Sequence, residues 1–435
     1  MNIHIIGIGG IGTSALAKHY IYEGHTVSGS DLNESETTQS LENLGVKIFI
    51  GPHSSSNIAK DLDLVVYTLA IPFDNPELIE ARNLRLKCIT YPEALGELTE
   101  EYFTIAVSGT HGKSTTTSMI GLLLMEAGLD PTIIVGTKLK ELDNSNYRAG
   151  KSKYLVIEAC EFKGAFLHYR PEIIILTNIE EEHMDFFKDL DHIFEVYTKY
   201  VQLLPENGLL IANQDDKNAY RIGKKLKEPI RLSLYSIKQK EFEKLKNILK
   251  IPGKHNISNA LAALAVAREL NIKDEISFNS LGKYTGSWRR FEKKLIKINN
   301  KEHSLIIDYG HHPTEIRVTL ESVREKYPNK EIYCIFQPHQ YQRTHYLWDN
   351  FIETFKNAPI DKIILTDIYD VAGREDEKIR EKVSSEKLAK ATQKESVIYV
   401  EKKNIIDHLK KELRGKEIIV VMGAGDIYKI IEDFA

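Results

Sequence analysis

A glycine loop between an apolar strand and a helix constrains the fold of this 435-residue chain more than any other feature. The sequence FTIAV predicts a buried strand, SGTHGKST follows it directly, and an apolar-patterned helix comes next. Gly109, Gly112, Lys113 and Ser114 match a shortened phosphate-binding loop, since a standard Walker A would place glycine at 107, where this chain has valine. In such loops the backbone N–H groups cradle phosphates, the lysine reaches the terminal phosphates, and the hydroxyl can ligate Mg²⁺.

Another glycine loop lies near the start of the chain and is the first along the sequence. Gly7, Gly9 and Gly12 match G-x-G-x-x-G after a short strand, and Asp31 follows 19 residues later, at the end of another strand. This pattern indicates a nucleotide or a nucleotide-linked ligand, with the diphosphate at the helix start and the carboxylate near a ribose or base. By itself it does not separate NAD from other diphosphates, and a tight turn without a ligand is the alternative.

The two loops together narrow the function. A dehydrogenase has no use for the phosphate-binding loop at Gly109–Ser114. A simple ATPase has no use for a second nucleotide-binding loop at Gly7–Gly12. An enzyme that uses ATP to activate a substrate carrying its own diphosphate needs both. We therefore expect the first loop to hold a nucleotide-sugar rather than NAD.

Short apolar runs alternate with helical patterns along the whole chain, which predicts an α/β fold with largely parallel sheets. We expect three domains, at 1–101, 102–291 and 292–435, with Rossmann-like first and third domains around a central ATP-binding one. The strands that we predict are Ile3–Ile6, Thr26–Ser28, Leu64–Tyr67, Thr104–Val107, Tyr154–Ile157, Ile173–Leu176, Ser304–Ile307, Glu331–Phe336, Lys362–Leu365 and Glu417–Val421.

Charge and cysteine content exclude several classes of protein. The formal net charge is −4 with both signs interspersed, so we expect no nucleic-acid partner. The three cysteines lie far apart without a C-x-x-C pair, which argues against a disulfide framework or zinc knuckle and suits a reducing compartment. No signal peptide or membrane-spanning run is evident, so we expect a cytoplasmic protein, a monomer or weak homodimer, without a membrane partner.

Candidate metal ligands follow two central strands. Glu158 ends YLVIE, and TNIEEEHMD brings Asn178 and His183 to the same predicted sheet edge. Glu158 and His183 could hold a metal ion in addition to one on Ser114. The alternatives are a helix cap for Glu158 and a surface position for His183. We expect the three glutamates of EEE to be solvated.

Further polar residues cluster at predicted turns. PGKHNISN places His255, Asn256 and Asn259 at a helix start, where amides could read an adenine edge or a phosphate, or merely cap the helix. WRRF places two guanidiniums at a domain joint, where one could close over a γ-phosphate.

The third predicted domain carries histidines on two loops. DYGHHPTE places Asp308, His311 and His312 after a strand, and FQPHQYQRT places His339 and Arg343 after the next. Adjacent histidines could bind zinc, but no third ligand has suitable spacing, so we do not expect a zinc site. MGAGDI forms a third glycine turn, which could be structural only.

In their order along nearly the whole chain, these segments resemble the Mur ligases. The segments that carry the resemblance are GIGGIGTSALA, SGTHGKSTTT, TNIEEEHMD, PGKHNISNALAALAVA, RRFE, DYGHHPTEI, FQPHQYQRT and MGAGDI. The resemblance is strongest to the alanine-adding members. It implies an ATP- and Mg²⁺-dependent ligase that joins L-alanine to UDP-N-acetylmuramate through an acyl phosphate.

The resemblance also implies roles for individual residues. It implies a UDP-sugar site at Gly7, Gly9, Gly10, Gly12 and Asp31. It implies an ATP site at Gly109, Thr110, His111, Gly112, Lys113, Ser114, Thr115, Asn178, His255, Asn256, Asn259 and Asp308, with magnesium on Ser114, Glu158 and His183. The catalytic set would be Lys113, Glu158, His183, Arg290, His311 and Arg343, with Arg290 at the γ-phosphate and Asp308 at the ribose. His311 and Arg343 would also face the amino acid and the acyl phosphate.

Two positions depart from the family pattern. Gln340 stands where many of these ligases have arginine, so that binding of the amino-acid carboxylate would rest on Arg343. Cys160 stands where we expect a carboxylate near the metal. Two other functions stay open: a ligase that attaches a ready-made tripeptide to the same sugar nucleotide, and a non-catalytic UDP-sugar-binding regulator.

Overall fold

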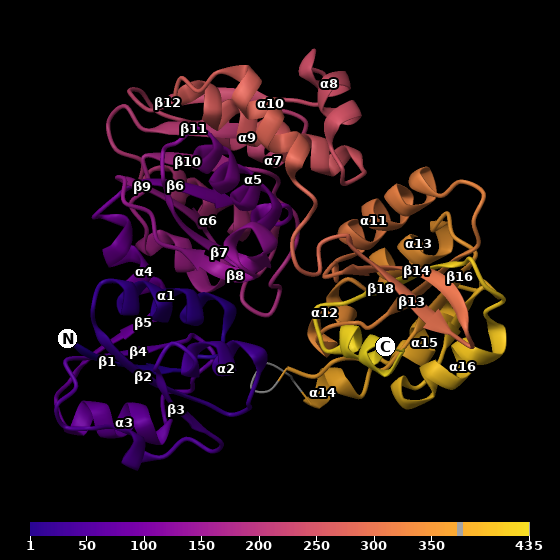
Figure 1. Ribbon diagram of the computed structural model, residues 1–435, viewed down its shortest axis with the longest axis horizontal. Coiled ribbons are helices and arrows are strands. Elements are labelled where there is room, and N and C mark those ends of the chain that lie inside the picture. Colours follow the sequence, from indigo (N-terminus) through magenta and orange to yellow (C-terminus); the bar gives the residue numbers. More distant parts are fainter. Residues whose placement is uncertain (372–376, 435) are drawn as a thin grey trace. The chain divides into compact units, whose positions relative to one another are not determined.

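The computed structural model describes residues 1–371 and 377–434 (Figure 1). Three sheets organise these residues, and most neighbouring strands are parallel, as the sequence predicts. By their contacts the residues form two compact units, which are described separately. The first contains residues 1–180, 191–242 and 258–282 with two sheets; the second contains residues 181–190, 243–257 and 283 onward with the third.

The first sheet is parallel, with strand order β3-β2-β1-β4-β5. Since β1 is followed in sequence by β2 on one side and is paired with β4 on the other, the glycine loop after β1 lies at the point where the strand order reverses. Its elements are β1 (Asn2–Ile6), α1 (Ile11–Tyr22), β2 (Thr26–Asp31), α2 (Glu36–Glu42), β3 (Lys47–Ile50), η1 (Ser55–Asn57), β4 (Leu64–Tyr67), α3 (Pro76–Asn83), β5 (Lys87–Thr90) and α4 (Tyr91–Thr99).

The second sheet has the order β12-β11-β10-β6-β9-β7-β8, and β8 pairs antiparallel with β7. The phosphate-binding loop joins the central strand β6 to α5. The strands are β6 (Phe103–Ser108), β7 (Thr132–Leu139), β8 (Ser145–Arg148), β9 (Tyr154–Glu158), β10 (Ile173–Leu176), β11 (Leu209–Asn213) and β12 (Arg231–Tyr235). The helices along this stretch are α5 (Lys113–Glu126), η2 (Lys140–Leu142), η3 (Phe162–His168), α6 (Leu190–Val201), α7 (Lys217–Lys224), α8 (Glu241–Ile248), α9 (Lys254–Glu269) and α10 (Asp274–Lys283).

The third sheet has the order β13-β14-β18-β15-β16-β17, and β13 pairs antiparallel with β14. Apolar side chains cover both of its faces, so the sheet is the centre of its domain. Its strands are β13 (Glu292–Ile298), β14 (Lys301–Asp308), β15 (Ile332–Phe336), β16 (Lys362–Leu365), β17 (Val397–Tyr399) and β18 (Ile418–Met422). Its helices are α11 (Pro313–Lys326), α12 (Tyr341–Tyr346), α13 (Trp348–Asn357), α14 (Glu377–Arg380), α15 (Ser385–Ala391), η4 (Lys402–Asn404), α16 (Ile405–Glu412) and η5 (Ile427–Phe434).

All ten predicted strands lie on observed strands, and the predicted fold class is confirmed. The sequence missed all six edge strands, which are β3, β5, β8, β12, β13 and β17, together with β7 and β11. Edge strands are partly exposed, as the burial of β3 and β5 illustrates, and therefore lack the continuous apolar runs that marked the buried strands. The domain boundaries at 101/102 and 291/292 stay a prediction. Within the described residues no helix is long and apolar enough to cross a membrane.

Candidate active site

The phosphate-binding loop adopts a backbone that requires its glycines. Gly109 and Gly112 have φ of +130° and +83°, in the region that favours glycine. A Cβ on Gly109 would lie 2.0 Å from the hydroxyl oxygen of Thr177, and one on Gly112 would lie 2.5 Å from the Asn259 side-chain oxygen. Asn259 therefore packs against the loop, and its place beside the nucleotide stays a prediction.

Lys113 folds back over this loop. Its Nζ donates to the carbonyls of Gly109 and Thr110 and lies 3.1 Å from a carboxylate oxygen of Glu161. Burial opposes the charge on the lysine, but Glu161 outweighs it, so the pKa of Lys113 is raised and the group stays cationic. Sequence reasoning passed over Glu161, although it belongs to the segment EACEF that follows β9.

Ser114 and Glu158 meet at the start of α5. The Ser114 hydroxyl donates to Glu158 Oε2 across 3.1 Å, and the Gly136 N–H of β7 donates to Glu158 Oε1. A hydroxyl beside a half-buried carboxylate is an oxygen donor set that suits Mg²⁺, so these two residues fit the predicted metal. The third predicted ligand, His183, belongs to the second unit, and its part in the metal site stays a prediction.

The end of β10 holds the loop from the other side. The Asn178 side chain accepts from the His111 N–H at 2.8 Å and donates to the His111 carbonyl at 3.1 Å, while Thr177 Oγ1 donates to the same carbonyl at 2.7 Å. The Thr110 N–H donates to the Asn178 carbonyl. Asn178 thus shapes the loop, and a direct contact with the nucleotide stays a prediction. Thr115 is buried in the first turn of α5.

The first glycine loop is braced by Asp31. Its Oδ2 accepts from the Gly9 N–H at 2.9 Å, and the Thr13 hydroxyl donates to the Gly7 carbonyl at 2.7 Å. Gly7 has φ of +79°, and Gly10 is the residue that precedes α1. In this arrangement the carboxylate orders the loop, and its predicted contact with the sugar nucleotide is not yet tested.

His255 and Asn256 lie at the start of α9. The Asn256 side chain donates to the Pro252 carbonyl at 2.6 Å, so this amide stabilises the turn that leads into the helix. Burial lowers the pKa of His255 to about 4, against the opposing effect of Glu315, which leaves the imidazole neutral near pH 7. Contact of either residue with a nucleotide stays a prediction.

Asp308 organises the domain joint within the second unit. Its carboxylate accepts from the N–H groups of Phe291 (2.9 Å) and Gly310 (2.8 Å), and burial raises its pKa against the effect of Arg290. Of the two arginines in WRRF, Arg289 is buried and donates to the carbonyls of the third glycine turn. The Arg290 guanidinium lies over the Tyr309 ring at 4.9 Å. The third glycine turn is thus held structurally.

Glu182 corrects one expectation, because we expected the EEE run to be solvated. Glu182 is buried, and its Oε1 accepts from the Nε and Nη2 atoms of Arg343, with Nε at 3.0 Å. Arg343 Nη1 donates to the His339 carbonyl at 2.9 Å. Burial alone would raise the pKa of Glu182, but the Arg343 guanidinium outweighs this effect and holds the pKa well below its usual range. Within the EEE run Glu181 is exposed and Glu182 is buried, a difference that three identical residues in the sequence do not reveal.

His311 lies near the same arginine. Its ring centroid is 5.8 Å from that of His339, and its Nδ1 is 3.2 Å from the Tyr309 carbonyl oxygen. Burial, assisted by Arg343, lowers the pKa of His311 to about 4, so a neutral imidazole faces this region at pH 7. The structure thus brings His311 and Arg343 near each other within one unit, and their contact with the amino acid and the acyl phosphate stays a prediction.

The two residues that depart from the family pattern lie in different surroundings. Gln340 is buried with φ of +75°, and its side-chain Nε2 has no partner among the described residues. Burial and the nearby Glu161 raise the pKa of the Cys160 thiol to about 11, so it stays a neutral group beside the phosphate-binding loop. His183 has φ of +56° next to Glu182.

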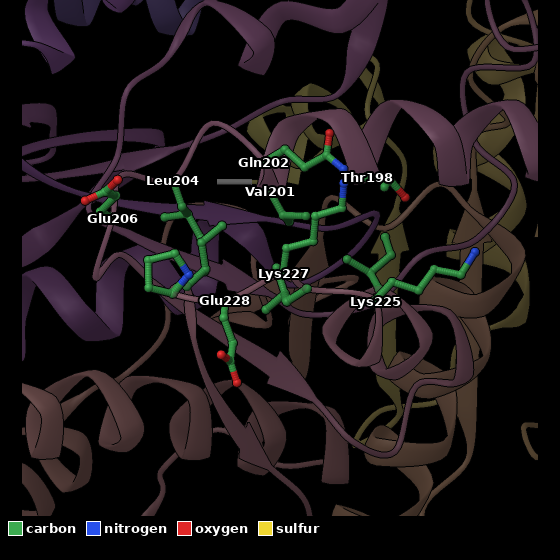
Figure 2. A pocket seen from close by; sticks show the side chains of 12 residues that line it. Thr198, Val201, Gln202, Leu204, Glu206, Lys225, Lys227 and Glu228 are labelled. Atoms are coloured by element: carbon green, nitrogen blue, oxygen red, sulfur yellow. The ribbon is translucent and has the colours of Figure 1, made fainter.

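A pocket of about 310 Å³ lies in the central domain and contains none of these residues. It lies between the end of α6 and the segment after α7, and Figure 2 shows side chains such as Val201, Leu204, Lys227 and Glu228 around it. We expect the active site at the loops after β6, β9 and β10 instead, because these loops carry the groups that the sequence predicts to bind phosphate.

Family models match the chain in three consecutive stretches. Residues 2–103 match "Mur ligase family, catalytic domain", residues 107–267 match "Mur ligase middle domain", and residues 289–425 match "Mur ligase, glutamate ligase domain". The chain belongs to the Mur ligase family.

Curated relatives in this family are similar over their whole length. The UDP-N-acetylmuramate–L-alanine ligase of Acetivibrio thermocellus is 41% identical over 457 residues, which cover 100% of this chain and 95% of that protein. The ligase of the same name from Clostridium acetobutylicum is 41% identical, with 99% of this chain and 97% of that protein covered.

Solved structures of the family superpose on the whole chain. The UDP-N-acetylmuramate–alanine ligase of Thermotoga maritima has a TM-score of 0.79 at 28% identity and covers 100% of this chain and 98% of its own. A murein peptide ligase from Psychrobacter arcticus has a TM-score of 0.72 at 24% identity, with 100% and 98% covered, and supports the fold alone. The α/β architecture of this Mur ligase is therefore that of its solved relatives.

Proposed function

We propose that this Mur ligase joins L-alanine to UDP-N-acetylmuramate with hydrolysis of ATP to ADP and phosphate, a step in the synthesis of peptidoglycan precursors. The observation that carries the proposal is that one compact unit holds both a glycine loop at a sheet switch point and a phosphate-binding loop with Lys113, Ser114 and Glu158. Full-length similarity to relatives named for this reaction supports the choice of substrates.

The chemistry explains why both loops are needed. A carboxylate is a poor electrophile, so the lactyl carboxylate oxygen first attacks the γ-phosphorus of ATP, which forms an acyl phosphate and releases ADP. The amine of L-alanine then attacks the acyl carbon and loses a proton, and the tetrahedral intermediate collapses to the amide and inorganic phosphate. Charge on the phosphoryl group in transfer requires fixed cations in a preorganised site.

The residues of the first unit meet that requirement. The loop N–H groups and Lys113 bind the β- and γ-phosphates, and we assign Mg²⁺ to Ser114 and Glu158, with His183 as the further ligand predicted from the sequence. When bound, the ion would neutralise charge on the phosphates. For Lys113 to reach a phosphate, its Nζ has to leave the carbonyls of Gly109 and Thr110, to which it donates in this structure.

The second unit supplies the groups for the acceptor. We assign Arg290 to the γ-phosphate, Asp308 to the ribose, and His311 with Arg343 to the amino acid and acyl phosphate. Burial and Arg343 lower the pKa of His311 to about 4, so the group that faces the acceptor is a neutral imidazole at pH 7. We further propose a cytoplasmic monomer or weak homodimer that needs neither nucleic acid nor a membrane.

Release of phosphate from ATP tests the proposal directly. With Mg²⁺ and UDP-N-acetylmuramate present, the enzyme is offered L-alanine, glycine, L-serine or the tripeptide L-alanyl-γ-D-glutamyl-meso-diaminopimelate. The proposal expects L-alanine to give the fastest release. Fastest release with the tripeptide would identify the recycling ligase, and no release with any acceptor would identify a non-catalytic UDP-sugar-binding protein.

A further inference from the structure

Tyr91, which the sequence analysis did not single out, is fixed at the first position of α4. Thr90 caps this helix: its hydroxyl accepts from the Glu93 N–H at 3.3 Å, and its own N–H donates to the Glu93 carboxylate at 2.7 Å. Pro92 follows within the first turn and restricts the backbone further. The side chain of Tyr91 therefore projects from a rigid base.

The Tyr91 ring lies directly against the first glycine loop. A Cβ built on Gly12 would lie 2.7 Å from both Cζ and Oη of Tyr91, which is too close for any side chain. Gly12 has an ordinary negative φ, so glycine is required here by the tyrosine and not by the backbone. Because Gly12 is the second residue of α1, the phenol oxygen lies beside the first turn of that helix, where free N–H groups are suited to an anion.

The hydroxyl is a donor without a protein acceptor. Across residues 1–371 and 377–434, Tyr91 Oη makes no hydrogen bond, and the side chain is half-buried. Burial, with the nearby charge of Glu158, raises its pKa above that of free tyrosine, so the group keeps its proton. Glu158 is also the carboxylate that we assign to magnesium, so Tyr91 contacts the glycine loop and feels the charge of that carboxylate within one unit.

We propose that Tyr91 is a substrate-binding residue whose hydroxyl donates a hydrogen bond to the diphosphate of the UDP-sugar. This assignment rests on the proposed function, since it takes the first glycine loop as the diphosphate site. The contact with Gly12 favours the diphosphate over the lactyl carboxylate, which must reach the ATP side of the site. Tyr91 would then fix the point from which the sugar and its carboxylate extend toward ATP.

The test compares the wild type with Tyr91→Phe, which removes the hydroxyl and keeps the ring against Gly12. Binding of UDP and of UDP-N-acetylmuramate is measured by calorimetry, and KM is measured for each substrate. We expect both ligands to bind about tenfold more weakly, as for loss of one hydrogen bond to a charged group, and the KM of UDP-N-acetylmuramate to rise alike. The KM values of ATP and L-alanine should stay within twofold.

Tyr22→Phe is the matched control, because Tyr22 lies exposed at the opposite end of α1. It should leave both affinities unchanged. Unaltered UDP affinity in Tyr91→Phe would overturn the inference. Equally weakened binding of uridine, which has no diphosphate, would also overturn it. A parallel loss of ATP affinity would do the same, because it would indicate a general structural role. If the wild type itself fails to bind UDP-N-acetylmuramate, the proposed function fails before Tyr91 is tested.

Discussion

At the scale of residues, the side chains of the phosphate-binding loop were easier to predict than the buried acidic residues that pair with cations. Lys113 and Ser114 belong to a loop motif with a fixed mechanism, so sequence spacing was enough to place them. Glu161 and Glu182 are acidic residues in acidic-looking segments, and only the fold reveals that each is buried beside a cation. Local sequence does not report burial of a charge, because the compensating group lies 48 positions away for Glu161 and 161 for Glu182.

Lys113→Ala tests the role of the loop lysine. We expect turnover to fall at least 10²–10³-fold, in the range of losing a preorganised charged donor to the transition state, while UDP-N-acetylmuramate still binds. Steady-state phosphate release and calorimetry measure the two properties. Lys199→Ala, at an exposed position of α6, is the control and should retain full turnover. Equal activity of the two variants would contradict the assignment.

Glu182→Gln tests the buried ion pair. The substitution leaves the Arg343 guanidinium buried without its carboxylate, and we expect the free energy of unfolding to fall by about 3 kcal/mol. Denaturant unfolding followed by intrinsic fluorescence measures the change. Glu181→Gln, the exposed neighbour, should change stability by less than about 0.5 kcal/mol. A stability loss shared by both variants would show that the pair itself is not responsible.

At the scale of elements, most buried strands of the described residues were predicted, whereas the edge strands and the two interior strands β7 and β11 were missed. Strands such as β10, with four buried apolar residues in succession, have the continuous apolar run that predicts a buried strand. Edge strands such as β13 contain charged residues among the apolar ones and therefore differ little in composition from loops. One missed element affects the site, because β7 supplies the Gly136 N–H to Glu158.

Gly136→Ala tests that contribution of β7. A Cβ at this position would lie 2.8–2.9 Å from both carboxylate oxygens of Glu158, and Gly136 has no positive φ, so the contact alone opposes the change. We expect the Mg²⁺ concentration for half-maximal activity to rise about tenfold, as when a partner of a metal ligand is lost. Direct Mn²⁺ binding, followed by electron paramagnetic resonance, should weaken in parallel. Unchanged metal affinity would contradict this role.

The first sheet contains a polar network that should control acid stability. Glu77 of α3 is fully buried and accepts from Ser30 of β2 (2.6 Å) and Asn57 of η1 (2.6 Å), while His4 of β1 lies 3.4 Å away. Burial works against the charge, but these contacts outweigh it and lower the pKa of Glu77 to about 2. Because folding lowers this pKa, the ionised Glu77 stabilises the folded protein at pH values above the pKa that it has in the unfolded chain. This stabilisation is lost as the pH falls toward the pKa of the folded state.

Glu77→Gln should therefore remove a pH-dependent part of the stability. We expect a loss of about 3 kcal/mol at pH 7 that shrinks as pH falls from about 4.5 toward 2, where the wild type loses the same contribution. Denaturant unfolding of both proteins across pH 2–7 measures it. A difference that does not depend on pH would show that the carboxylate charge is not what stabilises this network.

At the scale of the whole molecule, the proposed reaction draws on both compact units. The first holds the two phosphate-type loops, and the second holds His311, Arg343 and the segment that carries His183. Sequence patterns predicted three domains of one α/β class because each contains several buried parallel strands. They could not predict that residues 181–190, which lie between two elements of the central domain, make their contacts within the second unit, since such contacts depend on tertiary packing.

The central claim is that the sugar carboxylate is activated as an acyl phosphate. The most direct measurement uses UDP-N-acetylmuramate labelled with ¹⁸O in the lactyl carboxylate, together with ATP, Mg²⁺ and L-alanine, and analyses the released phosphate by mass spectrometry. The account predicts that one carboxylate oxygen passes to phosphate for each amide formed. Phosphate without ¹⁸O, formed at the same rate as the amide, would contradict the account, because the carboxylate would then never have carried the phosphoryl group.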